Sequence, residues 1–515
     1  MPATPLAQYA VHLRPEDNVA VAAKPFSPGL ELTFDGRTLV VTGRVGLGHK
    51  FAVRDIAAGE PVLKYGQTIG FASTDIPAGT HVHVHNVRAD AFARDYAFGR
   101  DCPPPPEAGE PRFFDGYDRG DGRYGTRNYL AIISTVNCSA STSKYIAERL
   151  RASGILERYP NVDGVLPIVH KAGCAMQYGG DDHKQLDRTL AGIARHPNVG
   201  AYLLVGLGCE TGQAMHLIEG EHLIQLNGSR KPPTVLSIQE CGGIAKTVDA
   251  GVQVVADMLP RVNDVKRTRL PAKHLVLGTN CGGSDGNSGV TANPALGIAS
   301  DLIVQQGGTS ILGETPEIYG AEHLLTRRAI SREVGEKLVE RIKWWEWYTG
   351  IFGTEINNNP SPGNKEGGLT TIYEKSLGAI AKGGATALVD VVHYAEPVTA
   401  KGLVVMDTPG YDPVSMTGIV AGGANVLVFT TGRGSVFGCK PAPSIKVATN
   451  TLLYRHMEDD MDIDAGVVLT GTPVETVGRQ IFEEILAVAS GKSTKSEKSG
   501  VGEEEFAPWA IGPTL

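Results

Sequence analysis

The stretch at residues 274–297, HLVLGTNCGGSDGNSGVTANPALG, constrains the fold more than any other part of the chain. It starts with a short apolar run typical of a buried strand, continues as a polar glycine-rich loop and enters a helical pattern at Pro294. This order of strand, loop and helix places ligand-binding groups at the carboxyl edge of an α/β sheet. A loop that only connects a strand to a helix needs a few residues, whereas this loop has about fifteen. We therefore expect it to bind a ligand rather than only to satisfy its own backbone.

The same order recurs along the chain from about residue 113. Apolar runs at six places each end in Cys, His or Glu, and parallel strands of one sheet bring such ends to one edge. We therefore expect these side chains to form one site. A single strand-end cysteine is explained by packing alone, but that explanation is strained for five of them together. The strand-end residues are Cys138, His170, Cys174, Cys209, Glu210, Glu240, Cys241, Cys281, Glu314 and Glu317.

Residues 1–98 have a different pattern, of short β-branched runs bounded by Gly, Pro and Asp. A D-I-x-A-G repeat at residues 55–59 and 75–79 predicts a small pseudo-symmetric β fold. The second copy leads into HVHVHN, where a strand would point His81, His83 and His85 to one face. Three imidazoles on one face favour a metal or proton-transfer surface over a solvated edge strand.

The domain organisation follows from these patterns. Residues 1–98 form the β-rich module, and residues 99–115, with four consecutive prolines, form a stiff linker. Residues 116–262 are expected as a first α/β domain and residues 263–515 as a C-terminal α/β domain. The predicted fold class is thus α/β, with a small N-terminal β module and a Rossmann-like main body whose parallel sheets lie in two parts.

Two later segments are candidates for substrate binding. Residues 357–368 form a second polar glycine loop, which is too long to be only a connection. The run TTGRGS at residues 430–435 ends a predicted strand with Arg433 among glycines. An arginine there suits a substrate carboxylate, which a guanidinium can hold with two hydrogen bonds.

Composition excludes several classes of partner. The net charge of −8 and the absence of a Lys/Arg block argue against nucleic acid. No run approaches the roughly 18 apolar residues of a membrane span, and the N-terminus lacks the pattern of an export signal. We therefore expect a cytoplasmic protein. Its seven cysteines are expected to be reduced, and so available as ligands or nucleophiles.

Several motifs resemble the altronate/galactarate dehydratase family of sugar-acid dehydratases over nearly the whole chain. The module resembles that family's SAF-type domain, and HVHVHN is closer to the altronate branch. The motifs are GHKFA (48–52), KYGQTIG (64–70), GTHVHVHN (79–86), GRYGTRNY (122–129), GDDH (180–183), GLGCE (206–210), CGGSDGNSGVTANP (281–294), SPGNKEGG (361–368) and TTGRG (430–434).

The resemblance implies a metal-dependent removal of water from a sugar acid, with D-altronate expected as substrate and a 2-keto-3-deoxy acid as product. The implied metal is divalent, Fe²⁺ or alternatively Mn²⁺. A metal on the carboxylate and 2-hydroxyl would stabilise an enediolate while a base removes the C2 proton. Spacing alone does not separate ligands from bases. The expected catalytic residues are His49, Lys50, His83, His170 and His183; the expected substrate-binding residues are Ser284, Asp285, Asn293, Asn364, Lys365 and Arg433; the expected metal ligands are His85, Cys174, Cys209 and Cys281.

Alternatives remain at this point. The substrate could be galactarate or another hexonate or hexarate, or the chain could be a related lyase that eliminates sulfite. An iron–sulfur cluster on the strand-end cysteines is a rival cofactor, although these cysteines lack the close pairs usual in cluster binding. A sugar-acid-binding protein without catalysis is a rival of another class. We expect a small-molecule partner and, as a further possibility, a homodimer.

Overall fold

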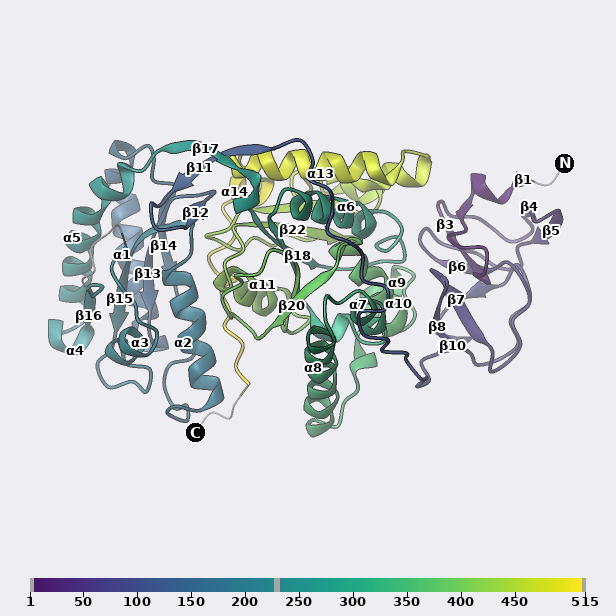
Figure 1. The fold of residues 1–515 in the computed structure, drawn as a ribbon, viewed down its shortest axis with the longest axis horizontal. Helices are drawn as coiled ribbons and strands as arrows, with labels where there is room; N and C mark the ends of the chain where they lie inside the picture. Colours follow the sequence, from purple (N-terminus) through teal and green to yellow (C-terminus); the bar gives the residue numbers. More distant parts are fainter. Residues whose placement is uncertain (1–3, 227–231, 512–515) are drawn as a thin grey trace.

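The computed structural model describes residues 4–226 and 232–511. In Figure 1 the N-terminal module (purple) and the second domain (blue to teal) occupy opposite ends, and the C-terminal domain (green to yellow) lies between them. The linker therefore runs along the C-terminal domain to reach the second domain. Within the described residues, no helix is long and apolar enough to cross a membrane.

The N-terminal module is built from short strands in three small sheets, with the orders β1-β4-β5, β10-β8-β7 and β2-β3-β6-β9. Its two repeat copies pair reciprocally: Asp75 accepts a hydrogen bond from the Ala58 amide and Asp55 accepts one from the Ala78 amide, both at 2.8 Å. This pairing agrees with the expected pseudo-symmetric β fold. The strands are β1 (Thr4–Pro5), β2 (Ala10–Val11), β3 (Val19–Ala22), β4 (Glu31–Phe34), β5 (Arg37–Val40), β6 (Lys50–Ala52), β7 (Pro61–Lys64), β8 (Gln67–Ala72), β9 (His81–Val82) and β10 (Val87–Arg88).

The histidine-rich segment differs from its prediction. Strand β9 ends at Val82 and the chain then turns, with the Asn86 side chain donating to the His81 carbonyl at 3.0 Å. The turn, and not alternation along a strand, gathers the imidazoles. The ring centroids of His83 and His85 lie 5.4 and 5.6 Å from that of His81.

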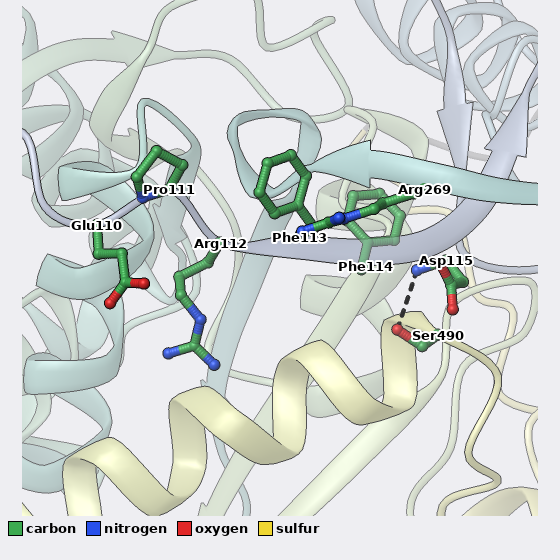
Figure 2. A pocket seen from close by; sticks show the side chains of 8 residues that line it. All are labelled: Glu110, Pro111, Arg112, Phe113, Phe114, Asp115, Arg269 and Ser490. Atoms are coloured by element: carbon green, nitrogen blue, oxygen red, sulfur yellow. Dashed lines mark hydrogen bonds between the residues drawn. The ribbon is translucent and has the colours of Figure 1, made fainter.

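The linker is fixed to the C-terminal domain by side-chain contacts. The Arg112 guanidinium binds both carboxylate oxygens of Glu483 at 2.7 and 2.5 Å, and the Asp115 amide donates to the Ser490 hydroxyl at 3.0 Å. The last residues of the linker begin β11 (Phe113–Asp118), which forms an antiparallel sheet with β12 (Tyr124–Gly125) and β17 (Arg267–Pro271). A surface pocket of 620 Å³ lies at this junction. None of the residues that line it, which are labelled in Figure 2, belongs to the predicted site.

The second domain is a parallel sheet of order β14-β13-β15-β16 with helices on both faces. Its apolar strands are buried on both sides, as parallel sheets require. Helices α1 and α5 cover one face, and α2 and α3 cover the other. The elements are β13 (Tyr129–Ser134), α1 (Ala140–Ala152), β14 (Gly164–Ile168), α2 (Asp181–Ala194), β15 (Val199–Gly206), α3 (Ala214–Gly220), β16 (Val235–Ser237), α4 (Ile238–Cys241) and α5 (Ile244–Asn263).

The C-terminal domain contains a seven-stranded parallel sheet of order β20-β21-β19-β18-β22-β23-β24. The chain winds outward from β18 through β19 on one side and from β22 through β23 on the other. Its elements are β18 (Val276–Cys281), α6 (Ala292–Gln305), β19 (Thr309–Leu312), α7 (Glu322–Arg327), α8 (Arg332–Ile351), α9 (Pro362–Glu366), α10 (Ile372–Ala379), β20 (Leu388–Val392), β21 (Gly402–Met406), α11 (Asp412–Ala421), β22 (Val426–Thr431), β23 (Ser444–Ala448), α12 (Thr451–His456), β24 (Ile463–Asp464), α13 (Val474–Ala489) and α14 (Lys495–Lys498).

The connections after β18 and after β22 therefore leave in opposite directions along the sheet. The crevice between the carboxyl ends of two such strands, called the topological switch point, is where α/β sheets bind their ligands. The loop that follows β18 and the TTGRGS loop that follows β22 both lie there.

The predicted fold class is confirmed, with parallel sheets in two parts. The expectation that six strand ends share one edge is wrong, because β13 to β16 belong to one sheet and β18 and β19 to the other. Hydrophobic runs predict strands but do not reveal which sheet a strand joins.

Candidate active site

The glycine loop after β18 contacts the N-terminal module so closely that side chains would not fit. A Cβ atom on Gly286 would lie 1.9 Å from the carbonyl oxygen of Gly48, and one on Gly368 would lie 2.6 Å from it. The Gly286 amide also donates to the Gly367 carbonyl at 2.8 Å. The glycines of both polar loops therefore allow the backbone of the module to dock at the switch point.

A buried ion triad fixes this docking. Helix α10 presents Glu374, whose two carboxylate oxygens accept from Lys50 at 2.8 Å and Lys64 at 2.9 Å. All three side chains are buried. Burial alone would raise the pKa of Glu374, but the two ammonium groups hold it well below its usual range. Burial lowers the pKa of Lys50 to about 8 despite the pairing.

Apolar packing extends the same contact. Val62, Ile69 and Val82 of the module share one hydrophobic cluster with Leu377 and Ile380 of the C-terminal domain. The free energy of burying this surface stabilises the docked arrangement. The module is thus part of the body's core and not a loosely tethered appendage.

Three imidazoles of the module, those of His49, His81 and His83, converge beside the second polar loop. The ligand atoms of the three lie within 4.8 Å of one another, and Nδ1 of His49 is 3.0 Å from Nε2 of His81. Nε2 of His49 donates to the backbone carbonyl of Glu366 at 3.0 Å. The His49 ring therefore carries its proton on Nε2, which leaves the Nδ1 lone pair directed into the group.

This group fits a divalent metal. A metal-binding histidine usually donates its second N–H to a carbonyl or carboxylate, as His49 does. Nδ1 of His83 is buried without a hydrogen-bond partner, so one ring nitrogen of the group is unsatisfied. Metal–nitrogen bonds of about 2.0–2.1 Å would bring the three donors around one ion.

The electrostatics of the group favour neutral, ligating imidazoles. Burial, with contributions from His49 and His85, lowers the pKa of His81 to about 4. Burial and then the Lys50 charge lower the pKa of His83 to about 3. Burial also lowers the pKa of His49. At neutral pH all three rings keep the lone pairs that a metal requires.

A second buried group lies at the carboxyl end of β18 and β19. The Cys281 thiol is 3.5 Å from Glu314 and 3.2 Å from Glu317. Each carboxylate is neutralised by a lysine at 2.6 Å, Lys382 for Glu314 and Lys375 for Glu317. The two ammonium groups already balance the two carboxylates, so this group has less need of a cation than the imidazoles have. Oε1 of Glu314 is nevertheless buried without a partner, which leaves one acceptor for a ligand.

Asp412 borders this second group from the first turn of α11. It accepts from the Asn280 side chain at 3.1 Å, and a Cβ on Gly282 would meet its other oxygen at 2.8 Å. Burial, followed by the charges of Glu314 and Glu317, raises the pKa of Asp412 to about 7. A carboxyl with this pKa can exchange protons near neutral pH.

Known protein families match the chain in three consecutive segments. Residues 8–90 match the altronate/galactarate dehydratase SAF domain, residues 116–263 the D-galactarate dehydratase/altronate hydrolase second domain, and residues 272–514 the D-galactarate/altronate dehydratase C-terminal domain. The chain is 35% identical over 508 residues to the altronate dehydratase of Bacillus subtilis, which covers 98% of this chain and 99% of that one.

The chain belongs to the altronate/galactarate dehydratase family. It is also 38% identical over 512 residues to the galactarate dehydratase (L-threo-forming) of Escherichia coli, with 97% of this chain and 96% of that one covered. A (2R)-sulfolactate sulfo-lyase subunit beta of Chromohalobacter salexigens is 31% identical over 399 residues, 77% of this chain and 96% of that one. The chain is therefore a hydro-lyase, and the non-catalytic alternative is set aside.

Of the residues predicted to bind substrate in this dehydratase, several hold the loops in shape. Asp285 accepts from Thr449 and Ser288, Asn293 bridges Gly378 and Thr430, and Asn364 caps α9 and donates to the Ser284 carbonyl at 2.9 Å. Ser284 is itself buried. Lys365 is partly exposed. Arg433 is exposed, and its guanidinium lies 3.4 Å from the Glu366 carboxylate. The two cations are thus accessible to a ligand at the rim of the junction.

The predicted catalytic and metal residues do not form one site. His49 and His83 lie in the imidazole group, while Lys50 is committed to Glu374 and His85 lies next to His81. Cys281 is buried in the C-terminal domain, whereas Cys174 and Cys209 are exposed in the second domain. His170 and His183 also belong to the second domain, where both ring nitrogens of His170 are hydrogen-bonded to backbone. The expected set of His85, Cys174, Cys209 and Cys281 is spread over three modules.

Several residues of the site had no catalytic, binding or metal role assigned to them from the sequence. His81 was recognised on the histidine face but was not chosen as a ligand. Glu314 and Glu317 carried the strand-end signal, whereas the sequence offered no signal for the rest. These additional residues are His81, Glu314, Glu317, Glu374, Lys375, Lys382 and Asp412.

Proposed function

We propose that this family member removes water from D-altronate to give a 2-keto-3-deoxy acid, at the junction of the SAF module and the C-terminal domain. The observation that supports this best is the imidazole group of His49, His81 and His83, docked against the loop at Glu366. We infer that these rings hold a divalent ion, Fe²⁺ or Mn²⁺. Once bound, such an ion supplies Lewis-acid stabilisation for negative charge on the substrate.

The chain's own residues would orient the acid. Arg433 lies on the loop after β22 with its side chain exposed, so it can offer two parallel N–H donors to a carboxylate. The carboxylate would thereby be fixed relative to the imidazole group, so that the C2 proton faces the protein.

Proton transfer requires a group that changes charge near neutral pH. We assign this exchange to Asp412, because its pKa of about 7 suits both removal of a proton and its return. As a base Asp412 would take the C2 proton, and as an acid it would assist loss of the 3-hydroxyl. The resulting enol would rearrange to the 2-keto acid.

The proposal is tested with purified protein, Fe²⁺ under reducing conditions, and a panel of sugar acids. Formation of 2-keto acid is followed with D-altronate, D-mannonate, D-gluconate and galactarate. D-Altronate should give the highest kcat/KM. Inactivity on D-altronate with activity on another acid would overturn the substrate, and inactivity on all of them would overturn the assignment of the site.

Galactarate is a second candidate substrate. The identity to the galactarate dehydratase is 38%, and galactarate carries a second carboxylate. Lys365 is a second, partly exposed cation on the loop beside Glu366 and could bind that group. Substitution Lys365→Ala should then raise KM for galactarate and leave KM for altronate unchanged. Equal changes for both acids would exclude a role for Lys365 in selecting between them.

A further inference from the structure

The second domain contains a separate group of metal-ligating side chains that the proposed reaction does not use. His183, in the first turn of α2, is fully buried and its Nε2 has no hydrogen-bond partner. Asp187 lies one helical turn further on, and His216 lies on the neighbouring helix α3. The ligand atoms of these three residues all lie within 4.8 Å of one another.

The distances in this group are those of donors around an ion. The Asp187 Oδ2 atom is 3.6 Å from Nε2 of His183 and 4.0 Å from Nε2 of His216. Both separations are too long for a hydrogen bond. Two ligands of one ion with bonds of about 2.0–2.2 Å can lie up to about 4 Å apart. The three atoms thus face a common point without bonding to each other.

The surrounding residues can set the imidazole tautomers for ligation. The Tyr178 hydroxyl is 3.0 Å from Nδ1 of His216, and it can accept the Nδ1 proton so that Nε2 keeps its lone pair. Nδ1 of His183 accepts a hydrogen bond from the Gly179 amide at 3.1 Å, so the neutral ring carries its proton on Nε2 and has to change tautomer when an ion binds. Ligation through Nε2 therefore requires the Tyr178–Gly179 peptide to turn its carbonyl toward Nδ1, and Gly179, exposed with a φ of 70° and followed by Gly180, is the residue at which the backbone would turn.

A second adjustment is needed at His216. The imidazole planes of His183 and His216 are nearly parallel, at 8°, so the His216 ring must turn toward Asp187. The His216 side chain is 38% exposed and has room to do so. The same exposure leaves the remaining coordination positions to water.

We propose that His183, Asp187 and His216 form a binding site for a divalent first-row transition metal ion in the second domain. The two imidazoles are borderline ligands and outnumber the one hard carboxylate, so the set suits Zn²⁺, Co²⁺ and Fe²⁺ better than Ca²⁺ or Mg²⁺. The site joins α2, which follows β14, to α3, which follows β15, and so ties together two crossovers of the sheet. In Figure 1 these helices belong to the domain at the far end from the SAF module.

The test counts metal ions in the full-length protein. Chelator-treated protein is titrated with Co²⁺, and the bound equivalents and the visible absorption of the ion are recorded. His216→Ala and His183→Ala should each bind one equivalent fewer than the unmodified chain. His222→Asn is the matched control, because it removes an exposed imidazole just beyond the end of α3. Equal stoichiometry in all four proteins overturns the site.

A second measurement needs no variant. Diethyl pyrocarbonate modification of His216 is followed by mass spectrometry with and without Zn²⁺. Zn²⁺ should slow modification of His216 and leave that of His222 unchanged. Equal rates at His216 with and without Zn²⁺ overturn the site, whatever the dehydratase activity of the sample. The protection is measured at His216 itself, so a metal ion bound to the imidazole group of the SAF module does not affect the result.

Discussion

Nε2 of His49 lies 3.0 Å from the backbone carbonyl oxygen of Glu366, across the boundary between the SAF module and the C-terminal domain. One hydrogen bond therefore serves two purposes. It helps to position the module, and it fixes the His49 tautomer so that Nδ1 can bind a metal. Docking of the module and assembly of the site are consequently coupled.

Replacing His49 should remove metal and activity together. His49→Ala deletes one of three donors and the contact with Glu366, so we expect kcat to fall by about 100-fold or more and the metal content to drop. Turnover and metal content after gel filtration measure both effects. His85→Ala is the comparison, because His85 lies beside the three-ring group and outside it. Loss of metal in His85→Ala but not in His49→Ala would contradict this assignment.

Removal of metal should abolish turnover reversibly. Because the pKa values of His81 and His83 are lowered to about 4 and about 3, the group stays neutral and competent for binding at pH 7. Dialysis against a chelator should stop formation of 2-keto acid, and Fe²⁺ or Mn²⁺ should restore it. Full activity in protein shown to be free of metal would exclude a metal-dependent reaction.

Arg433 should control substrate binding through its shape as well as its charge. Arg433→Lys keeps the charge and loses the paired donors, so it should cost on the order of 1–3 kcal/mol of binding, about 5- to 150-fold in KM. Steady-state kinetics with altronate measure this change. Arg455→Lys is the matched control, since Arg455 is exposed near the end of α12. If KM and kcat are unchanged in Arg433→Lys, Arg433 does not contact the substrate.

The sequence predicted the fold better than the site. Strands and loops followed from periodicity, and the glycine loop at residues 281–289 lies at the carboxyl edge of the sheet as expected. Sheet membership could not be read from local patterns, so Cys174 and Cys209 were grouped with Cys281 although a different sheet carries them. Glu374 and Lys375 illustrate a second limit. They are adjacent on α10, yet one pairs with the module and the other with Glu317, and spacing alone does not predict such long-range contacts.

Asp412 should make stability depend on pH in a particular direction. Its pKa is about 7 in the folded protein and near 4 in an unfolded chain. The folded state therefore holds more protons between these values, and the free energy of unfolding should fall as the pH rises from about 4 to about 7. Asp412→Asn cannot titrate and should lack this component. Urea unfolding of both proteins at pH 5, 6 and 7 measures the difference, and identical slopes with pH would contradict the raised pKa.

Deleting residues 1–98 tests whether the module is part of the catalytic site. Three hydrophobic clusters of the body contain no described residue of the module, whereas the cluster over β19, β20 and β21 includes Val62, Ile69 and Val82. Folding of the body is therefore measured first, by circular dichroism and gel filtration. The body should not turn over altronate, because it lacks all three imidazoles of the proposed metal group. Adding residues 1–98 as a separate chain should restore activity, because Lys50 and Lys64 can again pair with Glu374.

The control for this experiment is the charge on Glu374. In Glu374→Gln the two buried lysines lose their carboxylate, which should cost about 3–5 kcal/mol of the docked state. A Glu374→Gln body should therefore not be rescued by the added module. Glu366→Gln has an exposed side chain and keeps its backbone carbonyl, so it should be rescued like the unmodified body. Normal turnover by the body alone would mean that the imidazoles of the module take no part in the reaction.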